Sequence, residues 1–301
     1  MASVGAAASA PARRPPWWPV WRAATRDPGA WVGAAVFACV LLLAALAPRL
    51  APMDPEAQDI VHRLLPPMSA AAGHHFWLGT DQLGRDLVSR IIFGSRISLV
   101  VSLSAVAVSA LAGTAIGVSS GYAGRGWDDL LMRITDVQLA FPSILLSLAI
   151  VAVLGAGVRN LIAVLALSGW VGYARVTRSR VLGIRRQEYI DAARTMGARD
   201  ARIILRHVVP NVVPSVLTIA SFSLGGMITA EAALTFLGLG IPSNIPSWGG
   251  MLTDGAQYLS VAWWLATFPG AAIMLTVLAT NLIGDWLRDA LDPRAESGAV
   301  R

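Results

Sequence analysis

The sequence predicts an all-α integral membrane protein with six transmembrane helices. Only 14% of its 301 residues are charged and 55% are hydrophobic, whereas about 25% of the residues in a soluble domain are charged. A helix that crosses a bilayer core needs about 20 apolar residues, and the chain has long stretches of this kind. The stretches without Asp, Glu, Lys or Arg are 28–48, 97–124, 137–158, 208–230, 232–253 and 255–284.

The basic residues exclude several functions. All 24 of them are Arg, so the sequence contains no Lys. A phosphate-binding P-loop needs a Lys, and so do Schiff-base and Ser–Lys mechanisms. The chain therefore cannot carry a Walker-type ATPase site. A bias of Arg toward cytoplasmic loops explains the net charge of +6 more simply than nucleic-acid binding does, and no nucleic-acid partner is expected.

The N-terminal part is expected to hold a cytoplasmic segment and the first span. Residues 1–29 are rich in Ala, Pro and Arg, which indicates a partly disordered segment. Trp17, Trp18 and Trp21 suit the headgroup region, where their amphipathic rings are stable. The first transmembrane helix is predicted over 30–50.

A core of five further spans is predicted after a polar, turn-rich extracytoplasmic loop at 51–95. The core covers 96–290, with spans at about 97–119, 130–154, 159–175, 211–237 and 263–286. Pro142 predicts a kink in the second of these. The third is short, so Arg159 and Arg175 are expected to extend toward the membrane surfaces.

Two further features of the core concern packing. Gly113, Gly117 and Gly121 are spaced so that two helix backbones can approach closely. Chance in a chain rich in Gly and Ala explains the spacing equally well. The segment 239–262 contains several Pro and Gly residues and predicts a structured loop or a re-entrant turn.

The distribution of Arg predicts the orientation in the membrane. With six spans and a cytoplasmic N-terminus, eighteen Arg lie in segments on the inside and six in segments on the outside. Cytoplasmic loops carry the excess of basic residues. Both termini are therefore expected in the cytoplasm, including a tail at 291–301.

The most informative segment is the cytoplasmic loop at about 177–209. Helix-forming residues run from about 185 to 196, and Gly197 suits a C-terminal cap. A second short helix is predicted to start near Asp200 and to end before Pro210.

Three functions are compatible with the composition of this loop. A DNA-binding helix-turn-helix is disfavoured, because both ends are tethered to spans. The face formed by Arg199, Arg202 and Arg206 suits anionic lipid headgroups. Docking of a cytoplasmic partner is the third function, since Ala192 and Ala193 leave a smooth patch on an otherwise charged helix.

The loop resembles the EAA loop of ABC importer permeases. The match consists of Asp191-Ala192-Ala193, then Gly197 and Pro210, with Asp191 where the motif has Glu. Six further stretches resemble the peptide/nickel importer permeases, and together they indicate the C-type (second) permease of the dipeptide/oligopeptide branch. These are Leu78–Asp86, Phe93–Leu99, Ala140–Ser143, Glu231–Gly240, Phe268–Gly270 and Asn281–Arg294.

The resemblance implies a type I ABC importer permease fold and a transport function. Such a permease pairs with a homologous second permease, two cytoplasmic ATPase subunits and an extracytoplasmic substrate-binding protein. The chain would have no catalytic site, metal or cofactor of its own, because the partner ATPases bind ATP and Mg²⁺. The implied cargo is short peptides, with nickel, glutathione or another small solute as alternatives, and the implied location is the bacterial plasma (inner) membrane.

The implied coupling residues and the intramembrane polar residues are the site candidates. The ATPase-coupling residues are Glu188, Tyr189, Asp191, Ala192, Ala193, Gly197 and Pro210. Polar residues in a span are costly and so are candidates for the pathway: Asp136, Gln138, Glu231 and Asn281.

Each of these polar residues also has an alternative location or a purely structural role. Asp136 is expected to pair with Arg133 one helical turn away. Glu231 is expected near the outer boundary, lining the mouth or bonding to the 239–262 segment. Gln138 and Asn281 either line the pathway or bond across helices.

Two other classes of protein fit the sequence less well. A membrane enzyme is disfavoured because the chain has no HExxH motif and no pair of intramembrane Asp residues. A passive channel would not need a docking loop on the inside.

Overall fold

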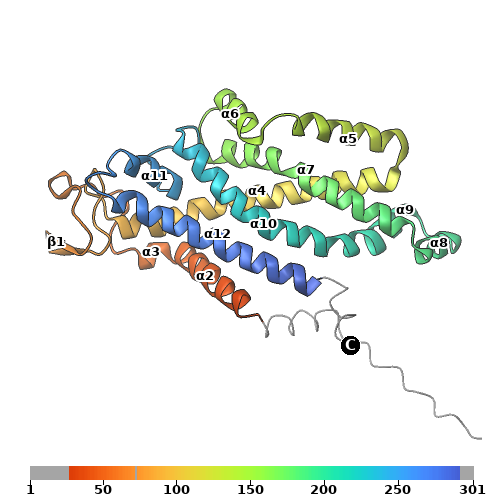
Figure 1. Cartoon of the computed structure of the whole chain (residues 1–301), viewed down its shortest axis with the longest axis horizontal. Helices are drawn as coiled ribbons and strands as arrows, with labels where there is room; N and C mark the ends of the chain where they lie inside the picture. Colours follow the sequence, from red (N-terminus) through yellow and green to blue (C-terminus); the bar gives the residue numbers. More distant parts are fainter. Residues whose placement is uncertain (1–26, 72, 292–301) are drawn as a thin grey trace, which may run out of the picture.

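A computed structural model describes residues 27–71 and 73–291 as a bundle of long helices (Figure 1). Nearly all of the expected N-terminal segment, including Trp17, Trp18 and Trp21, lies outside the described residues, and so does the tail after Leu291.

The elements follow one another in a simple order. In the segment 51–86, a 3₁₀ turn (Ile60–His62) precedes an antiparallel hairpin, in which Ser69 of β1 (Ser69–Ala71) pairs with Phe76 of β2 (His74–Phe76). The helices are α2 (Pro28–Ala45), α3 (Ala47–Leu50), α4 (Leu87–Ala123), α5 (Arg125–Leu139), α6 (Ser143–Leu154), α7 (Val158–Arg185), α8 (Glu188–Thr195), α9 (Asp200–Ile203), α10 (Val209–Phe236), α11 (Trp248–Ala256) and α12 (Trp264–Leu291).

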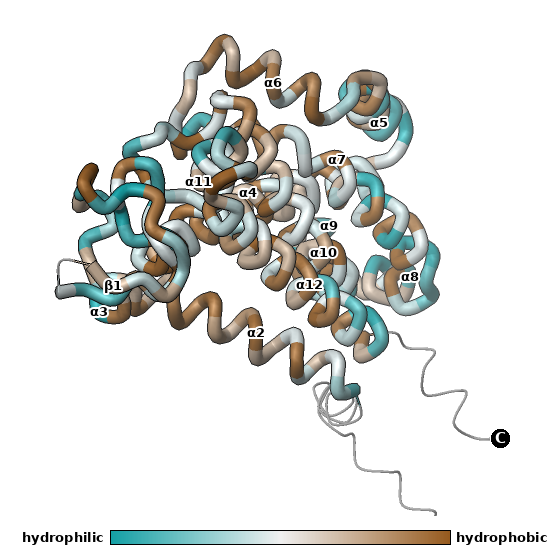
Figure 2. Tube along the Cα trace, turned by 60° about the vertical axis from the view of Figure 1, so that its left-hand side comes forward, coloured by the Kyte–Doolittle hydropathy of each residue, from teal (hydrophilic) through white to brown (hydrophobic). Residues whose placement is uncertain are grey.

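Four helical stretches of the described chain are long and apolar enough to cross a membrane. They are Pro28–Ala45, Leu87–Ala123, Asp200–Phe236 and Trp264–Leu291. The pair α5 and α6 is a fifth candidate, bent by 87°. In Figure 2, hydrophobic residues follow α2 and α6, whereas hydrophilic residues gather on α5 and α8.

The third span differs from the single kinked helix predicted at 130–154. The chain leaves the helix after Leu139 and starts a new one at Ser143. Pro142 has no N–H to donate and disfavours helical geometry at Phe141, which is in a bend. The proline therefore breaks the span instead of kinking it.

The fourth span is longer than predicted. Helix α7 continues past Arg175 to Arg185, so Arg175 and Arg178 are part of the helix and not of the loop. Both side chains are paired with aspartates of α5. An arginine whose charge is compensated in this way does not have to leave the bundle.

The glycines of α4 confirm a close helix–helix approach. A Cβ atom at Gly113 would lie 2.3 Å from the carbonyl oxygen of Trp170, and one at Gly117 would lie 2.4 Å from that of Ala174. At Gly121 it would lie 2.9 Å from Cβ of Val181. The spacing of these glycines therefore reflects packing against α7 and not chance.

The two ends of the bundle carry different structures (Figure 1). The hairpin, α3 and α11 lie at one end, and α8 and α9 lie at the other. Helix α11 forms within the 239–262 segment, which is therefore a structured loop. The start of α2 packs on the end of α12, since a Cβ atom at Gly33 would lie 2.9 Å from the carbonyl oxygen of Ala279.

Candidate functional site

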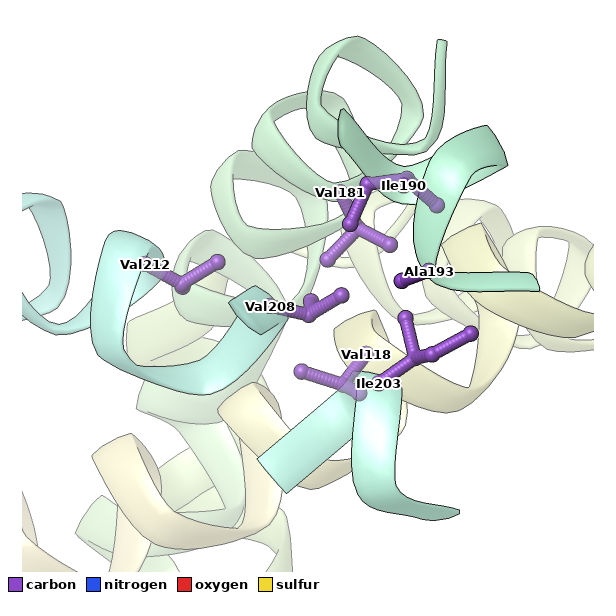
Figure 3. Packing of buried hydrophobic residues seen from close by; sticks show 7 residues of the cluster. All are labelled: Val118, Val181, Ile190, Ala193, Ile203, Val208 and Val212. Atoms are coloured by element: carbon purple, nitrogen blue, oxygen red, sulfur yellow. The ribbon is translucent and has the colours of Figure 1, made fainter. Parts of the chain in front are cut away.

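Helix α8 is anchored to the bundle by a small hydrophobic core. Ile190 and Ala193 point into this core, which also receives side chains from α4, α7, α9 and α10 (Figure 3). Its buried members are Val118, Val181, Ile190, Ala193, Ile203, Val208 and Val212. The core fixes the position of α8 relative to helices that run through the whole bundle.

The opposite face of α8 is free. Glu188, Tyr189, Asp191 and Ala192 are exposed, and the Tyr189 ring lies 6.0 Å from that of His207. The sequence-based prediction of one smooth patch made by Ala192 and Ala193 is therefore wrong. The two side chains are about 100° apart on the helix, and only Ala192 faces outward.

Helix α8 begins three residues later than predicted, at Glu188, and it ends close to the predicted position, at Thr195. The expected start near 185 is wrong, because α7 occupies the chain to Arg185 and Gln187 is the N-cap of α8. Gly197 has a φ angle of +82° and donates its N–H to the carbonyl of Arg194 at 2.9 Å. This is the left-handed geometry of a helix C-cap, which favours Gly.

Pro210 does not end the second helix of the loop, contrary to the prediction. Helix α9 passes through a π turn at Ile204–Val208 into α10, where Pro210 is one of the first two residues. The N–H of Val209 bonds to the carbonyl of Ile204, five residues back. This wider turn just before the proline lets the helix continue where an α turn would have been broken.

Two of the polar candidates connect α5 to α7. Asp136 forms an ion pair with Arg175, so the expected pair with Arg133 is wrong. Gln138 donates from Nε2 to the carbonyl of Leu167 at 2.6 Å and accepts from Nε1 of Trp170 at 2.8 Å. The structure thus favours a bond across helices for Gln138.

Glu231 is completely buried near the end of α10. Its Oε1 accepts a hydrogen bond from Oγ1 of Thr235 at 3.0 Å, and Thr235 Oγ1 accepts one from the N–H of Ile241 at 3.2 Å. Glu231 therefore contacts the 239–262 segment through Thr235. A side chain with no exposed surface does not line the mouth.

Asn281 lines a cavity of about 620 Å³ between α6, α7, α10 and α12. The described lining has no charged side chain. Besides Asn281, its polar side chains are Ser143, Ser147, Ser168, Ser223 and Thr229. Ser147 and Ser168 bond to each other at 2.9 Å, and Thr229 donates to the carbonyl of Gly225 at 2.9 Å. The lining is therefore neutral and mildly polar, which suits a wall that faces water or polar cargo.

Sequence reasoning missed a buried ion cluster at the end that carries α11. Asp81 accepts from Nε of Arg85 at 2.6 Å and also pairs with Arg90, while Asp254 lies 3.5 Å from both arginines. The signal was present in the motif Leu78–Asp86, where opposite charges lie four residues apart. Asp254, far away in sequence, completes the cluster from α11.

Comparison with known proteins decides the family. The family of binding-protein-dependent transport system inner membrane components matches residues 113–297. The chain belongs to this family. The N-terminal transmembrane domain of oligopeptide transport permease C matches residues 15–67, which confirms the resemblance to C-type permeases of ABC importers.

Named relatives of this inner membrane component extend over nearly the whole chain. A dipeptide transport system permease protein of Alkalihalophilus pseudofirmus is 41% identical, covering 94% of this chain and 91% of the relative. A di/tripeptide transport system permease protein of Pseudomonas aeruginosa is 40% identical over 93% and 92%. A glutathione transport system permease protein of Pectobacterium atrosepticum is 42% identical over 94% and 93%.

The family assignment agrees with the fold. An inner membrane transport component of bacteria needs helices that cross a bilayer, and α2, α4, α10 and α12 have the required length and hydropathy.

Proposed function

We propose that this chain is the C-type permease subunit of an ATP-driven importer that takes up short peptides. The observation that carries the proposal is that α8 is anchored to the bundle on one face and exposed on the other. Its inner face is fixed by Ile190 and Ala193, and its outer face exposes Glu188, Tyr189 and Ala192 at the tip of the bundle. A helix held in this way suits docking into a groove on a cytoplasmic ATPase.

The proposed topology has six spans with both termini in the cytoplasm. Helix α7, the fourth span in chain order, is added to the five candidates described above, because its 28 residues extend about 42 Å and it packs along α4. The start of α2 and the end of α12 lie toward the α8 end of the bundle (Figure 1). The excess of Arg there supports a cytoplasmic location.

The proposed subunit works within a larger assembly. A homologous second permease completes the pathway, an extracytoplasmic binding protein delivers the cargo, and two ATPase subunits bind ATP and Mg²⁺. Membrane lipids surround the bundle. The absence of Lys supports the assignment of ATP binding to the partner subunits, because this chain cannot form a P-loop.

The proposed pathway includes the cavity that Asn281 lines. Its neutral hydroxyl and amide groups can exchange hydrogen bonds with the amide groups of a peptide. Asp136 and Gln138, on α5 beside this region, are assigned to holding α5 on α7, and Glu231 to holding the outer segment.

The proposed cargo is a dipeptide or an oligopeptide, since two of the similar proteins are named for dipeptide or di/tripeptide transport. Glutathione is the second candidate, supported by the relative that is 42% identical. Nickel or another small solute would require a different lining from the neutral one described.

Reconstitution of the complete complex tests this proposal. The chain is co-expressed with the products of the genes that adjoin its own, and the purified complex is placed in liposomes with the binding protein. ATP-dependent uptake of a labelled dipeptide, exceeding that of labelled glutathione, is the expected result. Uptake without ATP would indicate a channel and contradict the proposal.

Gly197→Pro tests the docking helix within this assay. Proline cannot adopt the φ angle of +82° and removes the N–H bonded to Arg194. We expect loss of the ATPase partner or of ATP-driven uptake, whereas Gly197→Asn, which tolerates this geometry, retains both. Normal assembly and uptake by Gly197→Pro would refute the docking role of α8.

A further inference from the structure

Tyr122 connects helix α4 to the loop between α7 and α10, which contains α8 and α9. It lies in the last turn of α4, and its hydroxyl donates to Oδ1 of Asp200 at 2.5 Å. Asp200 is the first residue of α9, 78 positions further along the chain. The bond therefore joins two elements that have no direct covalent connection.

The ring of Tyr122 makes two further contacts with the same region. The guanidinium carbon of Arg194, on α8, lies 5.8 Å from the ring centroid, and that of Arg185, the last residue of α7, lies 5.9 Å from it. A cation within about 6 Å of an aromatic ring is attracted by it. Tyr122 also packs against the hydrophobic core whose buried members are shown in Figure 3.

One side chain of α4 therefore contacts α7, α8 and α9 together. The backbone ties α8 and α9 only to α7 and α10. Helix α4 is the longest of the described helices, at 37 residues, and its other end carries Arg90 of the buried ion cluster. Helix α4 therefore connects the contacts of Tyr122 to the ion cluster at the opposite end of the bundle.

We propose that Tyr122 is a positioning residue for transport, which transmits the movement of the docked loop to α4 through Asp200 and Arg194. The inference rests on the proposed docking of an ATPase on α8. Without the hydroxyl bond, the loop still docks, but its displacement is absorbed between α9 and α4. ATP hydrolysis then continues with less cargo moved.

The test measures cargo transported per ATP hydrolysed by the complete reconstituted complex. Tyr122→Phe removes only the hydroxyl and keeps the ring on both arginines. We expect normal recovery of the ATPase partners and a ratio lowered by about fivefold, which is the lower end of typical coupling between sites. Tyr122→Ala, which also loses the ring contacts, lowers it further.

Variants of Asp200 separate transmission from simple support of the loop. Asp200→Asn keeps an oxygen that accepts the bond and should retain the wild-type ratio, whereas Asp200→Ala should resemble Tyr122→Phe. The double variant Tyr122→Phe/Asp200→Ala should fall no lower than either single variant, because both remove the same interaction. Tyr258→Phe, at the opposite end of the bundle, is the matched control without effect.

Each result decides between explanations. A wild-type ratio in Tyr122→Phe would overturn the inference while leaving the proposed function intact. A loss of ATPase partners in parallel with transport would also overturn it, in favour of a purely structural role. A wild-type complex without ATP-dependent uptake would overturn the proposed function itself.

Discussion

The carboxylate of Asp128 on α5 accepts two hydrogen bonds from the guanidinium of Arg178 on α7, from Nε at 2.5 Å and from Nη2 at 2.6 Å. The hydroxyl of Ser120 on α4 donates to the same carboxylate. Three helices thus meet at one largely buried acid. Since α5 is set apart from the rest of the bundle in Figure 2, such polar bonds are an important part of its attachment.

Asp128→Ala is expected to destabilise the protein because it removes this bidentate pair and leaves Arg178 uncompensated. We expect a loss of about 1 to 3 kcal/mol, as for hydrogen bonds to charged groups, measured by thermal unfolding in detergent. Asp191→Ala is the control, since the pair of Asp191 with Arg194 at 3.3 Å is exposed and should contribute less than about 1 kcal/mol. Equal effects of the two substitutions would contradict this account.

Gly117→Ala is expected to separate α4 from α7. The new methyl group would lie 2.4 Å from the carbonyl oxygen of Ala174, and that backbone atom cannot move aside independently. Such overpacking costs about 1 to 3 kcal/mol. Gly172→Ala, in the middle of α7 with open space around it, should instead stabilise by about 0.5 to 1 kcal/mol. Melting temperatures of the two purified variants should shift in opposite directions.

Asp81→Ala is expected to be the most damaging substitution of the three. Asp81 lies between Arg85 and Arg90, both of which are buried, so its removal leaves two positive charges that share only the carboxylate of Asp254, 3.5 Å from each. Breaking a buried pair costs about 3 to 5 kcal/mol. The yield of folded protein after purification in detergent should fall sharply, whereas Asp54→Ala, at an exposed position of the segment between α3 and α4, should not change it.

The features predicted correctly from sequence depend on neighbours close in the chain. The left-handed cap at Gly197 follows from the composition of one helix end. The bounds of α10 and the start of α12 follow from continuous apolar stretches, whereas α12 extends five residues beyond its predicted end at 286. The close packing at Gly113 and Gly117 was one of two interpretations, and the carbonyl oxygens of α7 decided it.

The features predicted wrongly depend on partners distant in the chain. Asp136 was assigned to Arg133 because the two lie one turn apart, but Arg175 on α7 provides the charge. The same pairing allows α7 to continue through residues that hydropathy assigns to a loop. Ala193 was expected on the surface, because nothing in its local sequence shows that Val118 and Val212 converge on it. The contribution of Asp254 to the ion cluster with Arg85 and Arg90 was likewise not predicted, because Asp254 lies far from both in the sequence.

The neutral cavity beside Asn281 has an electrical consequence for the proposed importer. Because this wall carries no fixed charge in its described lining, it neither attracts nor repels cargo according to sign. Moving one elementary charge through a membrane potential of 100 mV changes the free energy by about 2.3 kcal/mol. Cationic and anionic peptides of equal size should therefore differ in their translocation rates chiefly through the voltage across the membrane, and collapsing that voltage should bring the two rates together.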